Sequence, residues 1–158
     1  MSDINFAENY SKYRKQLEEL GADLSKCAQS VVSKMADVGM KTSIKATPVG
    51  QYPSQVSFIT NDGKIVTFKV HKKIGGTLRR GWKKDATRKE GKDWISGFSN
   101  NVAYAIYVNG GHRIVSHGIT WGYVPGKRML EQGQNEAERQ APAIFEAKIA
   151  EIKQKGGW

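Results

Sequence analysis

Residues 4–39 read INFAENYSKYRKQLEELGADLSKCAQSVVSKMADVG, and this stretch sets the fold of the first quarter of the chain. Its apolar residues recur at steps of three and four, which places them on one face of an α-helix. We therefore predict a helix over residues 4–39 that is about 50 Å long, at roughly 1.5 Å per residue. The residues on its apolar face are Phe6, Tyr10, Tyr13, Leu17, Leu20, Leu24, Cys27, Val31, Met35 and Val38.

Another element must cover this apolar face. The spacing also suits a coiled coil, but it spans only about four heptads and the accompanying charge pairs are unremarkable. We therefore favour a β-sheet as the surface on which the helix lies. Gly21 costs on the order of 1 kcal/mol relative to alanine and could mark a bend, and we expect the helix to end by Gly39.

The middle of the chain predicts short strands joined by turns. Residues 47–53, with two prolines, are typical of a loop. Two alternating apolar runs follow, and Asn61-Asp62-Gly63 between them supplies a hairpin turn. Gly75-Gly76 breaks the chain, and Thr77 can cap a single helical turn at residues 78–80. The alternating residues of the hairpin are Val56, Phe58, Val66, Phe68 and Val70.

Tryptophans mark two further strands. One begins at Gly81-Trp82 and leads into a very polar loop through Lys92. The next contains Trp94, Ile95 and Phe98. With the hairpin, these strands predict a small, mostly antiparallel β-sheet.

A short helix and a long loop follow. Residues 103–109 suit a helix that Asn100 or Asn101 caps and Gly110 stops. The next segment, residues 110–126, holds five glycines and is predicted to be a glycine-rich loop. A loop of this length is usually functional or flexible.

The C-terminal segment is helical again. The pattern begins at Met129-Leu130 and continues to Arg139, and Pro142 fits the first turn of a new helix better than a helix interior. The apolar face of that new helix comprises Ile144, Phe145, Ile149 and Ile152.

These elements predict an α+β fold, in which a small, mostly antiparallel sheet packs with a long N-terminal helix and a C-terminal helical segment. The length suits one domain over residues 1–158. Within it we expect the N-terminal helix in residues 1–40 and the sheet region in 41–102. The short helix, the loop and the C-terminal helices occupy residues 103–158.

Composition and charge restrict the function classes. One cysteine, Cys27, excludes an intrachain disulfide and suits a reducing compartment. We predict no signal peptide and no membrane span, and so expect a soluble intracellular protein that does not bind membranes. The net charge is +10, and residues 64–92 hold 11 of the 25 Lys and Arg against two acids. This basic stretch can attract DNA phosphates, or its lysines can protect solvated strand edges from pairing.

The sequence predicts neither a catalytic nor a metal site. His112 and His117 share a loop, but a zinc site needs three or four ligands and Cys27 lies far away in sequence. We therefore expect these two histidines to form hydrogen bonds with the backbone or to face a partner, and not to bind a metal. The serines between residues 96 and 116 lie in no nucleophile elbow. The acids Asp85, Glu90 and Asp93 cluster in sequence, but they stand among lysines, which suggests a solvated charged loop and not a pair of catalytic carboxylates. We therefore predict a protein that is not an enzyme and binds no cofactor.

Four motifs occur in a fixed order and together cover about two thirds of the chain, from Thr47 to the C-terminal helix. In this order they resemble the neck and tail-completion proteins of tailed phages, a group similar to the minor tail protein Z of phage lambda. The motifs are TPVGQYP at residues 47–53, GGTLRRGW at 75–82, NVAYAIYVNGGHR at 101–113 and GYVPGKRML at 122–130.

The resemblance implies a structural virion protein that joins head and tail as an oligomeric ring around the DNA channel. The expected partners are other copies of the chain in a six-fold ring, head-completion or tail-terminator proteins, and tail tube proteins. Packaged DNA is a further expected partner, through its phosphates. The resemblance places the protein in the virion neck or tail, after assembly in the host cytoplasm. A tail terminator and a sequence-nonspecific DNA-binding module remain as alternatives.

Two groups of residues are candidates for these contacts. Tyrosines and other rings near the glycine-rich loop suit a subunit interface, because they bury well and tolerate a wet rim, although Tyr104 and Tyr107 could instead close their helix onto the sheet. The predicted interface residues are Tyr104, Tyr107, His112, Trp121, Tyr123 and Pro125. The predicted contacts to DNA or to an acidic partner are Arg79, Arg80, Lys83, Lys84, Arg88 and Lys89.

Overall fold

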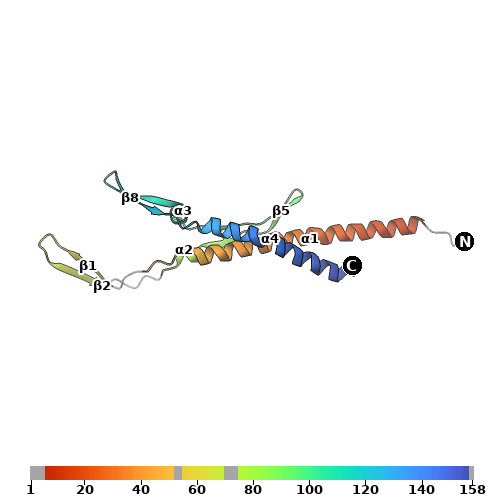
Figure 1. Ribbon diagram of the computed structural model, residues 1–158, viewed down its shortest axis with the longest axis horizontal. Coiled ribbons are helices and arrows are strands. Elements are labelled where there is room, and N and C mark those ends of the chain that lie inside the picture. The colour runs from red at the N-terminus through yellow and green to blue at the C-terminus, as the bar shows by residue number, and fades with distance from the viewer. Residues whose placement is uncertain (1–5, 52–54, 70–74, 157–158) are drawn as a thin grey trace.

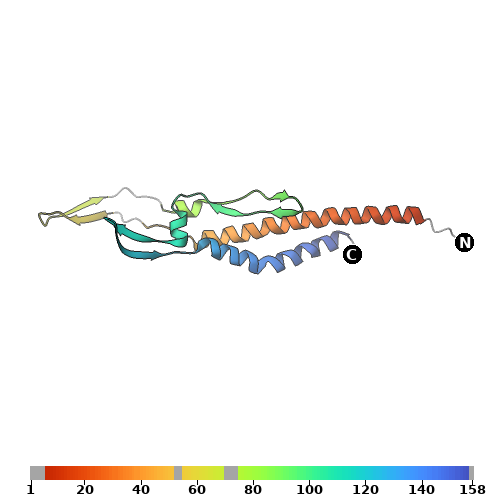
Figure 2. The same cartoon turned by 90° about the horizontal axis from the view of Figure 1, so that it is seen from above.

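The computed structural model describes residues 6–51, 55–69 and 75–156. Two long helices run antiparallel along an elongated molecule: α1 (Phe6–Ala46) and α4 (Met129–Gly156). β-hairpins extend beyond one end of the helix pair, as two roughly perpendicular views show (Figures 1 and 2). The N-terminal part of α1 runs past the end of α4 at the opposite end of the molecule.

Helix α1 confirms the predicted N-terminal helix but not its C-terminal limit. It continues through Gly39 to Ala46. The reason is packing, because Met40, Ile44 and Ala46 contribute to a core cluster that the last turns of the helix complete. Gly39 itself is buried, and a Cβ atom there would collide with the ring of Phe98.

The principal partner of α1 is α4, whereas the sequence favoured a sheet. The central part of the apolar stripe packs against α4. Strands β3 (Trp82–Lys84), β5 (Asp93–Ile95) and β6 (Phe98–Asn100) also contact α1. The contact between the helices centres on Cys27, Val31 and Ile144. Partly buried side chains that extend this cluster are Met35, Val38, Ile149 and Ile152.

Helix α4 is continuous, so the prediction of a new helix at Pro142 is wrong. Pro142 lies inside the helix with an exposed side chain. Its missing N–H removes one backbone hydrogen bond. Burial of Ala137 and Ile144 against α1 on both sides of the proline holds the two halves in one helix.

The described strands form four separate antiparallel pairs and no larger sheet. The α+β class and the antiparallel pairing are therefore confirmed, while the strands do not assemble into one sheet. The pairs are β1 (Gln55–Ile59) with β2 (Ile65–Lys69), β3 (Trp82–Lys84) with β6 (Phe98–Asn100), β4 (Arg88–Glu90) with β5 (Asp93–Ile95), and β7 (Gly111–Ser116) with β8 (Ile119–Pro125).

The β1–β2 hairpin confirms the predicted turn, and Gly63 in that turn has a φ of 75°. The predicted hairpin residue Val70 and residues 52–54 of the predicted loop lie outside the described residues. Two other predictions fail. The polar loop up to Lys92 contains β4, and the predicted next strand is divided, with Trp94 and Ile95 in β5 and Phe98 in β6.

The predicted loop over residues 110–126 is also wrong, because it is the β7–β8 hairpin. Its turn places His117 and Gly118 at positive φ, 51° and 78°. Positive φ at both central residues matches the right-handed twist of the flanking strands. A register shift follows Ile114, where Gly122 of β8 lies opposite.

A second core forms where the hairpins meet the helix pair. Leu78 of α2 (Thr77–Arg80), Trp82 and Met129 are its buried residues. Thr47 is fully buried at its edge, where its hydroxyl donates to the Ser43 carbonyl and accepts from Trp82 Nε1 at 2.7 Å. This hydrogen bonding ties the end of α1 to β3.

The predicted helix caps differ from the observed ones. Thr77 is the first residue of α2, and Gly76 at φ 93° precedes it without a side-chain cap. The short helix α3 (Ala105–Gly110) is capped by Tyr104, again without a side-chain bond. Asn100 instead donates to the Leu78 carbonyl and accepts from the N–H of Val102, so it links α2 to the chain before α3.

Candidate assembly interface

Helix α3 and the β7–β8 hairpin form an arm, residues 105–125, that projects away from the helix pair (Figures 1 and 2). Its two strands pair only with each other among the described residues. An isolated two-stranded hairpin is marginally stable in water. The arm must therefore be held at its base or covered by another surface.

Hydrogen bonds fix the base of the arm to the start of α4. The N–H groups of Lys127 and Arg128 donate to the carbonyls of Val108 and Asn109, at 2.8 and 3.0 Å. The Asn109 side chain accepts from the N–H of Leu130 at 2.9 Å, and its amide donates to Glu131 at the same distance. Asn109 thus satisfies a backbone donor in the first turn of α4 and holds the arm in one direction.

Glycines allow the backbone to approach closely at this base. Gly111 has a φ of 84°, and a Cβ atom on Gly126 would collide with the Asn109 carbonyl. Tyr123 completes the junction by donating from Oη to the Gly110 carbonyl at 3.0 Å. The base is rigidly defined, whereas the strands beyond it have no covering element among the described residues.

The predicted interface residues all lie on the arm or at its start, and all six are exposed. Trp121 is 73% exposed, and Tyr107 is 58% exposed. The rings of Tyr107 and His112 meet edge to face with centroids 6.4 Å apart, and His112 Nδ1 lies 3.5 Å from the Tyr107 carbonyl. Tyr104 and Tyr107 do not close α3 onto the core, because Ala105 and Val108 do so.

Sequence reasoning missed the aliphatic residues of the same surface. Their large exposed fractions, led by Ile106 at 72%, give the arm a mixed aromatic and aliphatic surface. The sequence signal was His117-Gly118 between two β-branched runs, which is typical of a two-residue hairpin turn. The missed residues are Ile106, Ile114, Val115, Ile119 and Val124.

The predicted basic contacts are spread over α2, β3 and β4, and most of them have intramolecular partners. Arg79 donates from Nε and Nη2 to the Thr47 carbonyl, at 3.2 and 2.7 Å. Arg80 donates to the Gly75 carbonyl at 3.2 Å. Lys84 bridges to α1 through Asp37 and Ser33, at 2.9 and 2.7 Å.

The other three basic residues are exposed. Arg88 pairs with Glu90 across 2.6 Å, and the Lys89 ammonium lies 5.8 Å from the centroid of the Trp94 ring. Within the part of the chain that is described, Lys83 makes neither a hydrogen bond nor an ion pair. Of the six predicted basic contacts, Lys83 is therefore the side chain most available to an external anion.

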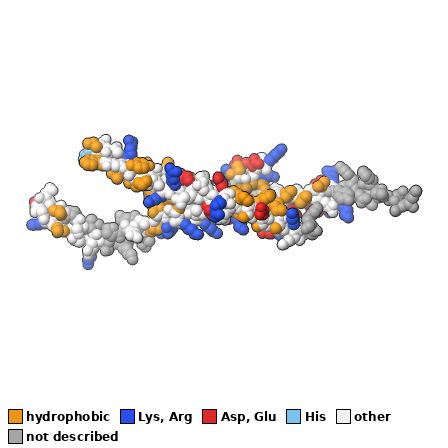
Figure 3. Space-filling view, viewed as in Figure 1, with side chains coloured by type: hydrophobic (Ala, Val, Ile, Leu, Met, Phe, Trp, Pro, Cys, Tyr) orange, Lys and Arg blue, Asp and Glu red, His pale blue; other side chains and the backbone are white. Residues whose placement is uncertain are grey.

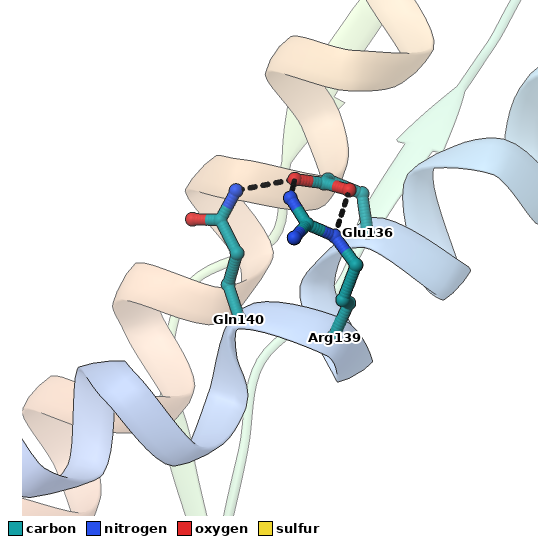
Figure 4. Close-up of polar contacts among 3 residues, drawn as sticks. All are labelled: Glu136, Arg139 and Gln140. Carbon is teal, nitrogen blue, oxygen red and sulfur yellow. Dashed lines mark hydrogen bonds and ion pairs between the residues drawn. The ribbon is translucent and has the colours of Figure 1, made fainter.

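A carboxylate on α4 is held ionised by its neighbours (Figure 4). Arg139 donates to Glu136 from Nε and Nη2 at 2.9 and 2.6 Å, and Gln140 donates to the same carboxylate. These hydrogen bonds lower the pKa of Glu136 to about 2. The pKa of Glu131 is lowered as well, by hydrogen bonds from its own backbone N–H and from Asn109.

Among residues 6–51, 55–69 and 75–156, no three His, Cys, Asp or Glu side chains gather as metal ligands. His112 and His117 bond locally, since His117 Nδ1 lies 3.1 Å from Ser116 Oγ. Cys27 is buried between the long helices. No helix within the described ranges is long and apolar enough to cross a bilayer.

Comparison with protein families gives a match over residues 11–111, which is more than half of the chain. The matching family is HK97-gp10-like, described as "Bacteriophage HK97-gp10, putative tail-component". The match includes most of α1, which the four sequence motifs did not cover, and ends at the first residue of β7. No curated protein and no solved structure matches the chain.

Proposed function

The chain belongs to the HK97-gp10-like family of phage tail components, and from this we propose that it is a neck or tail-completion subunit. It is a structural protein of the tailed-phage virion. In the proposed role, identical copies close a six-fold ring around the DNA channel and join head to tail. Such a role requires one surface that binds a neighbouring copy and others that contact the rings above and below.

The observation that carries this proposal is the exposed apolar surface of the arm. Large exposed apolar areas on soluble chains mark interaction sites, and aromatic side chains are enriched in interface cores. The strand edges of the arm also offer unpaired backbone groups, which a neighbouring chain can pair. The six predicted interface residues and the five aliphatic residues beside them would together form the intersubunit contact.

Purified protein, imaged by electron microscopy alone and after mixing with tails that lack it, tests the proposal. We expect rings of uniform diameter, either free or at the head-proximal end of the tail. Trp121→Ser should abolish the rings without unfolding the chain. Phe145→Ser is the matched control, because Phe145 is an exposed aromatic on α4, outside the arm. A wild-type chain that forms no ring in either setting contradicts the proposal.

The partners above and below are proposed to be a head-completion or tail-terminator ring and the tail tube. A position on the tube itself, directly over its last ring, would favour the tail-terminator alternative. The same images decide between the two positions. They also decide whether the ring has six subunits.

Contact with packaged DNA is a second proposed role, supported by the positive charge of residues 64–92. Lys83→Glu tests it better than a change at Arg79, which would leave the Thr47 carbonyl without its donors. We expect the variant to assemble normally and to lose DNA affinity, most clearly at low salt. Equal DNA binding by wild type and variant would instead favour an acidic protein partner.

A further inference from the structure

We propose that the β7–β8 hairpin of each subunit's arm is received by a groove on the next copy, formed by α1, β3, β6, α3 and the start of α4. This inference rests on the proposed ring, since it names the counterpart of the arm. The groove consists of two adjacent hollows of about 320 and 290 Å3, which share Phe98 and Leu130 as lining residues. Met35 and Ala137 line the first hollow, and Trp82 and Ile106 line the second.

The groove and the arm have matching surfaces. The walls of both hollows are predominantly apolar, as is the outer part of the arm. Hydrophobic side chains gather on the β7–β8 hairpin and again over the middle of the helix pair (Figure 3). Trp121, the most exposed large apolar side chain of the arm, suits the role of a central anchor, because tryptophan often dominates binding energy at interfaces.

Charge complementarity supports the same pairing. The segment between Asp93 and Glu131 contains no acid, and Arg113 is the one charged residue of the β7–β8 hairpin. The groove carries carboxylates at its rim. Glu138 lines the first hollow, and Asp85 lies so close to Gly97 that a Cβ atom there would be 2.9 Å from Asp85 Oδ2.

An arm-to-groove contact also explains a closed ring. It joins two different surfaces, so an open chain of copies keeps a free arm at one end and a free groove at the other until the ring closes. A contact between two arms would be self-complementary and would end at a dimer. It would also bring two copies of Arg113 together and leave the acidic rim of the groove without a partner.

Two variants that each disable one surface test the pairing. Trp121→Ser disables the arm. Gln134→Arg disables the groove, because Gln134 is exposed, lines the first hollow, and would place a cation where Arg113 must approach. Gln154→Arg, at another exposed position of α4, is the control, and circular dichroism checks that all variants are folded.

We expect each variant alone to be monomeric and the Gln154→Arg control to assemble as wild type does. A mixture of the two should form a dimer with one copy of each, measured by native mass spectrometry. In that dimer an intact arm occupies an intact groove, and the remaining surfaces are both disabled. For rings that form only on tails, Thr120→Cys with Gln134→Cys should give a ladder of cross-linked copies that neither single variant gives.

If Gln134→Arg forms normal rings and Trp121→Ser remains monomeric, the groove is not the surface that receives the arm, although the proposed ring still holds. Rings of Gln134→Arg that no longer attach to tails would assign the groove to a different virion protein. Wild-type protein that remains monomeric both alone and on tails would contradict the proposed function as well.

Discussion

The Phe98 ring lies against two buried glycines, Gly39 of α1 and Gly133 of α4. A Cβ atom on Gly133 would be 3.0 Å from Phe98 Cζ and would collide with Ser43 and with the Gly39 carbonyl. Ser43 in turn donates to the Met129 carbonyl at 2.9 Å. At the residue scale, the crossing of the long helices therefore depends on the absence of two side chains.

Gly133→Ala should destabilise the protein, because the helices must separate or Ser43 and Phe98 must move. Overpacking of this kind costs about 1–3 kcal/mol. Gly21→Ala is the control: nothing lies within 4 Å of its Cβ position, and alanine there should stabilise the helix by roughly 0.5–1 kcal/mol. Urea unfolding measures both. If alanine raised the free energy of unfolding by a similar amount at both positions, the close approach of α1 and α4 at Gly133 would be contradicted.

Glu136 gives the protein a pH-dependent contribution to stability. Its pKa is lowered from 4.5 to about 2 in the folded state, so its ionised form is favoured by folding. The contribution is present above pH 4.5 and is lost as pH falls from there through about 2. We expect the Tm of wild type to exceed that of Glu136→Gln at neutral pH and to converge with it toward pH 2. A Tm difference that is constant over this range would argue against the network with Arg139 and Gln140.

At the scale of elements, two consecutive residues of α4 face opposite environments. Ile144 is 7% exposed against α1, whereas Phe145 is 53% exposed. Ile144→Ala should therefore cost about 2–5 kcal/mol of unfolding free energy. Phe145→Ala should cost far less, despite its larger side chain. Thermal or urea unfolding of the two variants checks the register of α4, and the reverse order would place the wrong face on α1.

Local periodicity predicted α1, the β1–β2 hairpin and the C-terminal helical residues, because each depends on neighbours in sequence. It did not predict that α1 continues past Gly39, since Phe98 and Gly133, which make glycine suitable there, are remote in sequence. Sequence spacing likewise predicts a helix start at Pro142, because the α1 surface that packs against this part of α4 is remote in sequence. The cost of the proline in a helix interior is offset by packing on both sides, which sequence spacing does not reveal.

The candidate interface was predicted in part. The density of aromatic side chains in residues 104–125 predicts the rings of the interface, but the glycines of the same segment predict a loop where the structure has a hairpin. Two of them are needed at the base of a hairpin, where Gly111 has positive φ and Gly126 approaches the Asn109 carbonyl. The role of Asn109 in joining the arm to α4 depends on a tertiary contact and carried no sequence signal.

At the scale of the whole molecule, stability and assembly are located in different parts of the chain. The buried clusters lie between α1 and α4 and around Trp82, whereas the β7–β8 hairpin of the arm buries none of its large side chains. Local opening is easiest where few apolar contacts support the backbone hydrogen bonds. The free subunit should consequently have a stable helix pair and a weakly protected arm.

Hydrogen exchange measures this separation directly. In the free subunit, the amides of β7 and β8 should exchange much faster than those around Val31 in α1. Assembly should slow exchange in the arm by at least about tenfold, because a neighbouring subunit then covers it. The β1–β2 hairpin serves as an internal reference, since it is also two-stranded and lies apart from both the β7–β8 hairpin and the groove. Its amides should change little on assembly.

Protection of the arm that is already high in the free subunit, or unchanged in the ring, would mean that the arm is not the surface that neighbouring copies cover.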